Sequence, residues 1–432
     1  MSKKIFSIMS ILLVASMLLT ACSQSTTAPV EPTSAPAENT QAPAPTEAPA
    51  ETQAPAAGQP DACATDAFGC AVIKPGETIK IGMGAPMTGD NAQFGIDISQ
   101  GASIAIEDAG EFGGFSFELV VDDDGGTGEG GAAVANKLVS DPTVVAIEGH
   151  IFSGATAAAI PIYEQAGLPM MSPSATNPPL TQSGSKVFNR AVFTDAAQGK
   201  FAAEYLYDKL GIRKLAIMHD GQSYGQGLAQ VVNDEFTALG GEVVQFEAIN
   251  PGESDYSAPL ADIAAKSPEA LYFGGYVAEA VVIVNQMKQA GLNGVIFFGD
   301  DGTFGQDYLD RTGANGEGSY ATSLVPPASD AKTKFDAAYE SQFGQPPGKL
   351  SPYTWTAYDS AAVLIDNIKK VGIKGSDGNM YIPRGALVDA VRNTKDYQGL
   401  SGVVTCDAVG ECSSSGPTFY VDQGGQWVEA QK

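Results

Sequence analysis

Hydroxyl side chains follow two neighbouring apolar segments of this chain. Ser153 comes shortly after the segment 144–148 and opens a helical pattern, whereas Ser174 and Thr176 follow the segment 168–171 in a turn. If both segments are parallel strands, their carboxyl ends meet at the edge of the sheet where small polar ligands bind. Free N–H groups at a helix start favour an anion. The pattern therefore predicts a carboxylate-binding edge.

Two acidic side chains follow a third apolar segment further along the chain. Asp300 and Asp301 come directly after the segment 295–298 and Gly299. An acid of this kind suits an ammonium group, and an α-amino acid carries both an ammonium and a carboxylate. Each motif also has a plain structural explanation, because Ser often caps helices and Asp often forms turns. Both explanations stay open at this point.

Short strands alternate with helical patterns over most of the chain, which predicts βαβ units with parallel sheets buried on both faces. The predicted strands are 78–82, 115–121, 144–148, 168–171, 214–218, 242–247, 270–273 and 295–298. The helical patterns are 101–108, 132–139, 155–165, 197–210, 228–239 and 277–290, with longer helices at 331–343 and 353–369 and a hairpin at 402–428. We expect an α/β fold of two similar lobes, dividing near residues 191–195.

The N-terminal segment has the features of an export signal. Lys3 and Lys4 precede the apolar run 5–18, and Cys22 follows Leu-Thr-Ala. This resembles a bacterial lipobox, which implies a signal peptide over 1–21 and lipidation of Cys22; a plain secretory signal is the alternative. Residues 23–60 contain eight prolines and no basic residue, which predicts an extended tether over 22–60. The chain is expected to be exported and held at the outer face of the cytoplasmic membrane.

Charge and cysteine usage narrow the classes of partner. The chain has 24 Lys and Arg against 50 Asp and Glu, so its net charge is −26 and nucleic acid is an unlikely partner. Four cysteines remain besides Cys22, and an even number in an exported chain indicates disulfides. Three connectivities are possible. The short loops between them favour Cys63 with Cys70 and Cys406 with Cys412.

Other chemistries are weakly supported. Residues 126–131 fit the pattern G-x-G-x-x-G, but four acids crowd the place of a pyrophosphate, so a surface turn is the better interpretation. The same acids match a calcium loop poorly. Only His150 and His219 are available for a metal or a Ser–His–Asp triad. We expect no metal, no cofactor and no enzymatic activity; an exported hydrolase using Asp300 or Asp301 is a minor alternative.

Several motifs in order resemble the leucine/isoleucine/valine-binding proteins, which are periplasmic binding proteins of type I that serve ABC importers. The resemblance covers residue 78 to the C-terminal hairpin. It is carried by the segments 92–95, 136–139, 149–153, 172–176, 219–220, 224–227 and 272–276.

The resemblance implies a ligand site in a cleft between two lobes that are joined by a three-stranded hinge and close on the ligand. It implies lobes at 77–194 plus 325–398 and at 195–324 plus 399–432. Ser153 and Thr176 would donate to the ligand carboxylate, Ser174 would offer backbone groups and Asp301 would pair with the ammonium. The remaining implied site residues are Tyr224 and Tyr276, which close on the ligand, and Phe94, Ile151, Phe152 and Tyr353, which line the side-chain pocket.

The implied function is capture of an aliphatic α-amino acid and its delivery, by a monomer, to a permease and ATPase complex. Two departures affect the side-chain preference. Asp301 stands where the family commonly has Glu, and the bulky Phe152 occupies a position that forms a disulfide in some members. A wider or polar amino-acid specificity therefore stays possible. The alternative function is a sensor, in which the same two-lobed domain signals through a partner.

Overall fold

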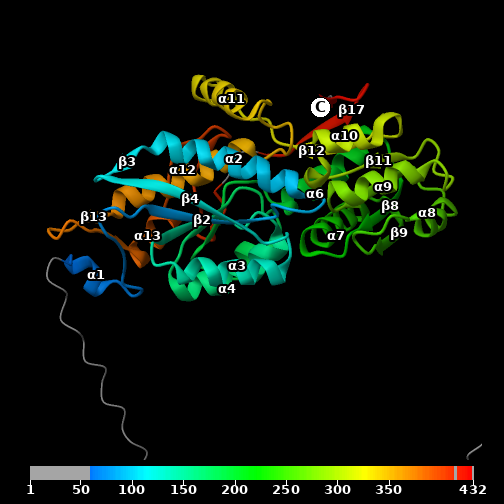
Figure 1. Ribbon diagram of the computed structural model, residues 1–432. Coiled ribbons are helices and arrows are strands. Elements are labelled where there is room, and N and C mark those ends of the chain that lie inside the picture. The colour runs from blue at the N-terminus through cyan, green and yellow to red at the C-terminus, as the bar shows by residue number, and fades with distance from the viewer. Residues whose placement is uncertain (1–58, 413–415, 431–432) are drawn as a thin grey trace, which may run out of the picture. The chain divides into compact units, whose positions relative to one another are not determined.

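The computed structural model describes residues 59–412 and 416–430 (Figure 1). The predicted signal peptide, the lipidation site Cys22 and nearly all of the predicted tether lie outside these residues. Two main sheets are present, each flanked by helices. The first sheet has the strand order β3-β4-β2-β5-β6-β7 and the second has the order β18-β17-β12-β11-β10-β8-β9. We call the first sheet with its packed helices the first lobe, and the second sheet with its packed helices the second lobe.

The first sheet is parallel except for its edge strand β3. All six residues of β5 are buried, as expected for a parallel strand that is covered on both faces. Helices α3 and α4 lie on one side of this sheet, and α2 and α12 pack together on the other (Figure 1). The strands are β2 (Ile79–Ala85), β3 (Glu111–Phe112), β4 (Phe115–Asp123), β5 (Val144–Gly149), β6 (Met170–Ser172) and β7 (Phe188–Arg190). The helices are α2 (Ala92–Ala109), α3 (Gly128–Ser140), α4 (Ser153–Ala166), α5 (Pro179–Gln182), α11 (Asp330–Phe343), α12 (Thr354–Val371) and α13 (Arg384–Arg392).

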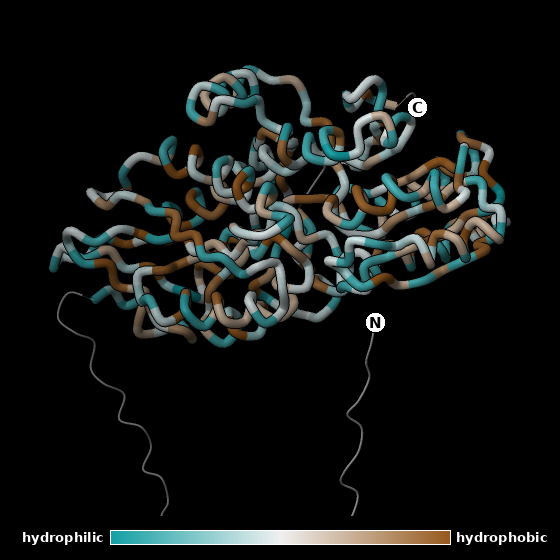
Figure 2. The backbone as a smooth tube through the Cα atoms, turned by 45° about the vertical axis from the view of Figure 1, so that its right-hand side comes forward, coloured by the Kyte–Doolittle hydropathy of each residue, from teal (hydrophilic) through white to brown (hydrophobic). Residues whose placement is uncertain are grey.

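The second sheet combines a parallel centre with an antiparallel edge formed by β17 and β18. Its strands are β8 (Lys214–His219), β9 (Glu242–Ala248), β10 (Ala270–Gly274), β11 (Ile296–Phe298), β12 (Tyr320–Ser323), β17 (Thr418–Asp422) and β18 (Trp427–Glu429). Its helices are α6 (Asp195–Glu204), continued by a π-turn at Tyr205–Lys209, α7 (Ser223–Ala238), α8 (Ser257–Ala264), α9 (Val277–Met287) and α10 (Gln306–Thr312). The hydrophobic cores combine strand residues with the inward faces of the packed helices, and hydrophobic and hydrophilic segments alternate along the chain (Figure 2).

The chain passes between the two sheets three times. It leaves the first sheet after β7, returns after β12 to build α11 and α12 against α2, and re-enters the second sheet at β17. The α/β fold of two lobes is therefore confirmed, with each lobe a mostly parallel sheet. The exact lobe boundaries stay a prediction. The segment 400–412 contributes Cys406 and Cys412 to the hydrophobic core of the first lobe, although we expected residues from 399 onward in the second.

Two minor sheets were not anticipated from the sequence. Strand β1 (Cys70–Ile73) pairs with β14 (Met380–Pro383), which also pairs with β13 (Ile373–Lys374), beside α1 (Asp61–Thr65). The predicted hairpin over 402–428 is wrong in its first half. Strand β16 (Val403–Val404) pairs with β15 (Tyr397–Gln398), and the hairpin is formed by β17 and β18 alone. Disulfides join Cys63 to Cys70 and Cys406 to Cys412, the two predicted local pairs.

Candidate ligand-binding site

The ends of β5 and β6 form one side of the site. Hydroxyl groups bind the two loops to each other: Ser172 Oγ donates to His150 O at 2.7 Å, and Ser174 Oγ donates to Ile151 O at 2.8 Å. The hydroxyl of Ser174 is therefore engaged in fixing the loop, and its backbone N–H donates to Ser172 Oγ at 3.4 Å. The predicted contribution of Ser174 backbone groups to ligand binding stays a prediction.

Two further hydroxyls on this side are buried and less constrained. Ser153 is the first residue of α4 and accepts from Asn177 N at 3.3 Å. Thr176 is completely buried, and its Oγ1 lies near enough to the Asp195 carboxylate to lower the pKa of that acid, although the two groups do not meet in good hydrogen-bond geometry. Because buried polar groups are nearly always well paired, this weakly held hydroxyl is a candidate partner for a polar ligand group. The N–H groups of the first turn of α4 add partial positive charge beside it.

Asp301 forms the opposite side of the site, in a short 3₁₀ turn after β11. Its Oδ1 accepts from the hydroxyl of Tyr224 and from Gln198 Nε2 at 2.6 Å, while its Oδ2 accepts from the hydroxyl of Tyr353. Tyr224 lies in α7 and Gln198 in α6 of the second lobe, whereas Tyr353 precedes α12 of the first. The Asp301 carboxylate is thus held from both lobes.

Three fully buried acids, Asp195, Asp300 and Asp301, gather here, and within the described part of the chain none of them forms an ion pair with a basic side chain. Burial and the charge of Asp301 raise the pKa of Asp195 and of Asp300 well above the usual value, and burial likewise raises the pKa of Asp301. The side chains of Thr176 and Gln198 lie close to the Asp195 carboxylate and partly offset this rise in its pKa, but neither forms a hydrogen bond of good geometry with it. The more distant charge of Arg190 offsets only part of the effect on Asp195. A cation bound here would stabilise the ionised form that burial and mutual repulsion disfavour, so the site is suited to a cation.

Aromatic rings from both lobes enclose the space between these two sides. Phe152 of the first lobe stacks on Tyr276 of the second, with ring centroids 4.2 Å apart, and Phe94 meets both rings edge-on. The cavity between them contains about 250 Å³ of space not filled by atoms, part of which is open to solvent. Its lining consists of Phe94, Ile151, Phe152, Ser153, Ser174, Tyr224, Tyr276, Gly302 and Tyr353.

The structure brings the ten predicted site residues together. Eight of them line the cavity. Asp301 accepts hydrogen bonds from the hydroxyls of two of these eight, Tyr224 and Tyr353. Thr176 lies two residues after Ser174 in the chain. Tyr353 differs from expectation, because its hydroxyl binds Asp301 in addition to lining the cavity. That these residues bind a ligand stays a prediction.

Sequence reasoning missed three residues of this site: Asp195, Gln198 and Asn177. Asp195 and Gln198 lie three positions apart at the start of α6, so they share one face of that helix. Their place directly after the predicted division between lobes was the available signal. Asn177 follows Thr176 immediately, and its side-chain amide donates to Ser223 O and, at 3.2 Å, to Ser223 Oγ on the other lobe.

The glycine-rich segment 126–131 serves packing of α3. Thr127 caps this helix by accepting from Gly130 N at 3.0 Å. We expected a surface turn here, but the start of the turn is buried. Asp124 is buried, and its Oδ2 lies 2.7 Å from His150 Nδ1. In residues 59–412 and 416–430, no cluster of three or more His, Cys, Asp or Glu side chains is arranged to hold a metal ion.

Comparison with known proteins identifies the family. Residues 78–425 match the family model described as periplasmic binding protein. The chain is similar to a leucine-, isoleucine-, valine-, threonine- and alanine-binding protein of Pseudomonas aeruginosa, with 34% identity over 299 residues that cover 68% of this chain and 79% of that protein. It is also 34% identical over 326 residues to a Leu/Ile/Val/Thr-binding protein of Salmonella typhimurium, covering 73% and 86% of the two chains.

Solved structures agree with this assignment. The leucine-binding protein of Thermotoga maritima has a TM-score of 0.73 at 28% identity, covering 82% of this chain and 98% of that one. A branched-chain amino acid transporter substrate-binding protein of Streptococcus pneumoniae, solved with isoleucine, has a TM-score of 0.72 at 28% identity and covers 82% and 100%. No helix within the described part of this chain is long and apolar enough to span a membrane. The chain belongs to the type I periplasmic binding proteins, in the family of leucine/isoleucine/valine-binding proteins, and is a solute-binding protein.

Proposed function

We propose that this protein binds an aliphatic α-amino acid between its two lobes. The observation that carries the proposal is the pairing of two opposite sides in one cavity. Behind the lining of this cavity, one side has the buried hydroxyl of Thr176 beside the start of α4, and the other has the buried carboxylate of Asp301. These are the complements of a carboxylate and an ammonium.

In this proposal the ligand carboxylate accepts from Thr176, Ser153 and the N–H groups at the start of α4. The ammonium donates to Asp301, whose orientation is fixed by the hydroxyls of Tyr224 and Tyr353. An unpaired charged group would be costly in so buried a site. Recognition of both charged ends should therefore be strict.

The aromatic rings of Phe94, Phe152 and Tyr276 would contact the ligand side chain. They offer no charged partner to it, which favours aliphatic over charged side chains. The enclosed space is small, so we expect larger side chains to bind with adjustment of these rings or of the lobes. The names of the two curated relatives include threonine, and one includes alanine, which supports testing small side chains as well as leucine.

We further propose that the protein is an exported lipoprotein, attached through Cys22, that delivers its amino acid to an ABC permease. The proposal is supported by the lipobox-like sequence before Cys22 and by the relatives' membership of transport systems. Metabolic labelling with a fatty acid, compared between the wild type and Cys22→Ser, tests the attachment. Labelling of both chains would refute it.

A thermal-shift panel of the common amino acids tests the binding function. A ligand at a hundredfold excess over its dissociation constant stabilises a protein by about 2.7 kcal/mol. We expect leucine, isoleucine, valine, alanine or threonine to raise the melting temperature. N-acetylleucine and leucinol, which each lack one charged end, should have little effect. If no amino acid shifts the melting temperature, the proposed function is wrong.

A further inference from the structure

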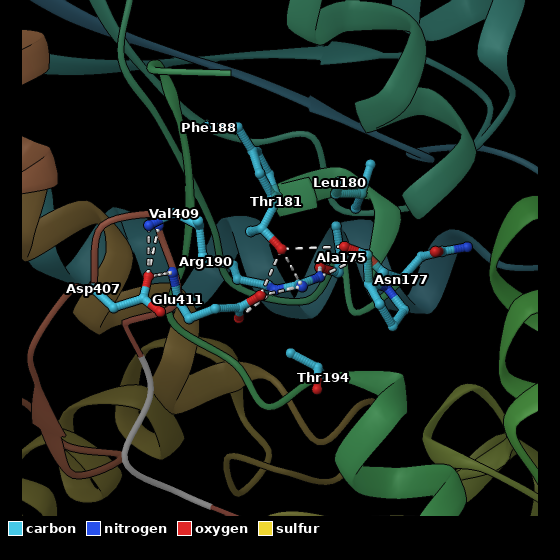
Figure 3. Close-up of polar contacts among 12 residues, drawn as sticks. Ala175, Asn177, Leu180, Thr181, Phe188, Arg190, Thr194, Asp407, Val409 and Glu411 are labelled. Carbon is cyan, nitrogen blue, oxygen red and sulfur yellow. Dashed lines mark hydrogen bonds and ion pairs between the residues drawn. The ribbon is translucent and has the colours of Figure 1, made fainter. Parts of the chain in front are cut away.

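Arg190 ends β7 and is completely buried, yet all five of its N–H donors have partners (Figure 3). Nη1 donates to Ala175 O at 3.0 Å and to Asn177 O at 2.8 Å. Nη2 donates to Thr181 Oγ1 at 3.1 Å and to Glu411 Oε1 at 2.5 Å, and Nε donates to Glu411 Oε2 at 2.8 Å. This guanidinium therefore has one fixed orientation.

The two carbonyl groups held by Nη1 lie on either side of Thr176. The carbonyl of Thr176 itself accepts from Asp195 N at 3.0 Å. Three consecutive carbonyl groups are thus fixed by bonds that do not involve the Thr176 side chain. The backbone on both sides of the Thr176 hydroxyl, the group that we propose contacts the ligand, is therefore fixed in place.

The same hydrogen bonds of Arg190 also support the contact between the two lobes. Arg190 holds the backbone of Asn177, whose side-chain amide donates to Ser223 at the start of α7. Asn177 N also donates to Ser153 Oγ. The peptide held by Arg190 therefore carries both a predicted ligand group and a bond across the cleft.

The orientation of Arg190 depends on a loop more than 200 residues away in sequence. Glu411 lies in the loop closed by the Cys406–Cys412 disulfide, and Thr181 Oγ1 also donates to its Oε1 at 2.7 Å. Backbone bonds dock the loop on the end of the first sheet: Arg190 N donates to Gly410 O at 2.9 Å and Cys412 N donates to Arg190 O at 3.0 Å.

The loop is also rigidified from within. The Asp407 carboxylate accepts from the N–H groups of Val409, Gly410 and Glu411, each at 2.9 Å (Figure 3). A carboxylate that accepts three backbone N–H groups fixes the turn that presents Glu411. The disulfide closes the same turn covalently.

We propose that the Cys406–Cys412 loop is a positioning element of the ligand site. It presents Glu411 to Arg190, and Arg190 in turn fixes the peptide around Thr176 and Asn177. Glu411 and Arg190 are positioning residues, since they act on the ligand through this peptide. The proposal rests on the proposed amino-acid site, and it adds a distant loop that sets the affinity of that site.

The test compares the removal of two disulfides. The variant Cys406→Ser/Cys412→Ser should raise the dissociation constant for L-leucine by about tenfold or more in calorimetry. The matched control Cys63→Ser/Cys70→Ser opens a loop of similar size beside β14, so it should leave the dissociation constant unchanged. Equal effects of the two variants would overturn the proposal.

A double-mutant cycle separates positioning from a general loss of stability. Thr176→Val removes the hydroxyl that the loop is proposed to position. In that background the Cys406→Ser/Cys412→Ser change should weaken leucine binding much less than in the wild type. Additive effects would contradict the proposed route through Thr176.

Hydrogen exchange of the ligand-free protein gives a measurement that does not depend on binding. The amides of Asn177 and Asp195 should exchange about tenfold faster in the Cys406→Ser/Cys412→Ser variant than in the control, because Asn177 itself lies on the peptide held by Arg190 and Asp195 N donates to the Thr176 carbonyl of that peptide. Unchanged exchange would overturn the positioning role. If the wild type binds no amino acid, the proposed function fails, and the exchange rates alone decide whether the loop positions the peptide.

Discussion

The Asp301 carboxylate accepts hydrogen bonds from side chains of both lobes. One oxygen is held by two side chains of the second lobe, Tyr224 and Gln198, and the other by Tyr353 of the first. Separation of the lobes would therefore remove a donor from a buried acid. In the proposed function, lobe closure and ammonium binding would be coupled through this one side chain, since both would provide hydrogen bonds to the same carboxylate.

Replacement of Asp301 by Asn should abolish amino-acid binding. The change removes the charge that pairs with the ammonium, and losing one partner of a buried charged pair costs about 2–5 kcal/mol. We expect the dissociation constant in calorimetry to rise by at least about a hundredfold.

The control is Asp262→Asn, which makes the same change on an exposed part of α8 in the second lobe. It should bind like the wild type. Circular dichroism should show that both variants are folded. Wild-type affinity of a folded Asp301→Asn protein would remove Asp301 from the site.

At the scale of elements, close contact between α3 and α4 explains part of the G-x-G-x-x-G pattern. A Cβ at Gly131 would lie 2.5 Å from the carbonyl oxygen of Ala155, whereas a Cβ at Gly128 would make ordinary contacts of 3.6 Å or more. Both glycines lie in the same helix. The spacing that resembles a dinucleotide motif thus includes a position required for helix packing.

These two glycines provide a matched pair of substitutions. Gly131→Ala should reduce the free energy of unfolding by about 1–3 kcal/mol, since overpacking forces the helices apart. Gly128→Ala should leave it unchanged or raise it by up to about 1 kcal/mol, because Ala favours the helix. Urea denaturation measures both. Equal effects of the two substitutions would contradict the packing explanation.

The sequence predicted the elements whose signal is local. The apolar run 144–148 matches β5, and Lys214–His219 matches the predicted strand at 214–218 within one residue. The hydroxyls and acids at strand ends were predicted by the same reasoning. Strand β14 was missed because its partner β1 lies some 310 residues earlier, and the bond between Arg190 and Glu411 spans 221 residues. Such pairings depend on the assembled fold and leave no periodic signal.

At the scale of the whole molecule, buried acids make stability depend on pH. Burial raises the pKa of Asp97 and of Asp359 to about 6 and that of Asp220 to about 7, from 3.8 in the unfolded chain. At pH values between the pKa of the unfolded chain and the raised pKa of the folded protein, the folded state binds more protons than the unfolded state. The free energy of unfolding therefore falls as pH rises from about 4 to about 7. The shift of Asp97 alone corresponds to on the order of 3 kcal/mol.

Glu148 offers a single-residue test of this dependence. It is fully buried in β5, neither carboxylate oxygen has a hydrogen-bond partner in the described part of the chain, and burial raises its pKa well above 4.5. Glu148→Gln should leave stability at pH 4 nearly unchanged and raise it by about 1–3 kcal/mol at pH 8. The control Glu340→Gln lies on an exposed part of α11 and should change neither value. Chemical denaturation at both pH values measures the effect, and a Glu148→Gln variant with the wild-type pH slope would contradict it.

The N-terminal segment of the described chain is attached to the first lobe, and this attachment bears on any hinge motion. The Asp66 carboxylate accepts from the N–H groups of Gly385 and Ala386 at 3.0 Å each, and β1 pairs with β14 beside it. Together with the Cys63–Cys70 disulfide, these contacts attach the segment containing α1 and β1 to α13 of the first lobe (Figure 1). A force applied from the N-terminal side is therefore borne by the first lobe. If the lobes hinge as proposed, the second lobe, which carries Asp301, Tyr224 and Tyr276, is the one that moves relative to this attachment point.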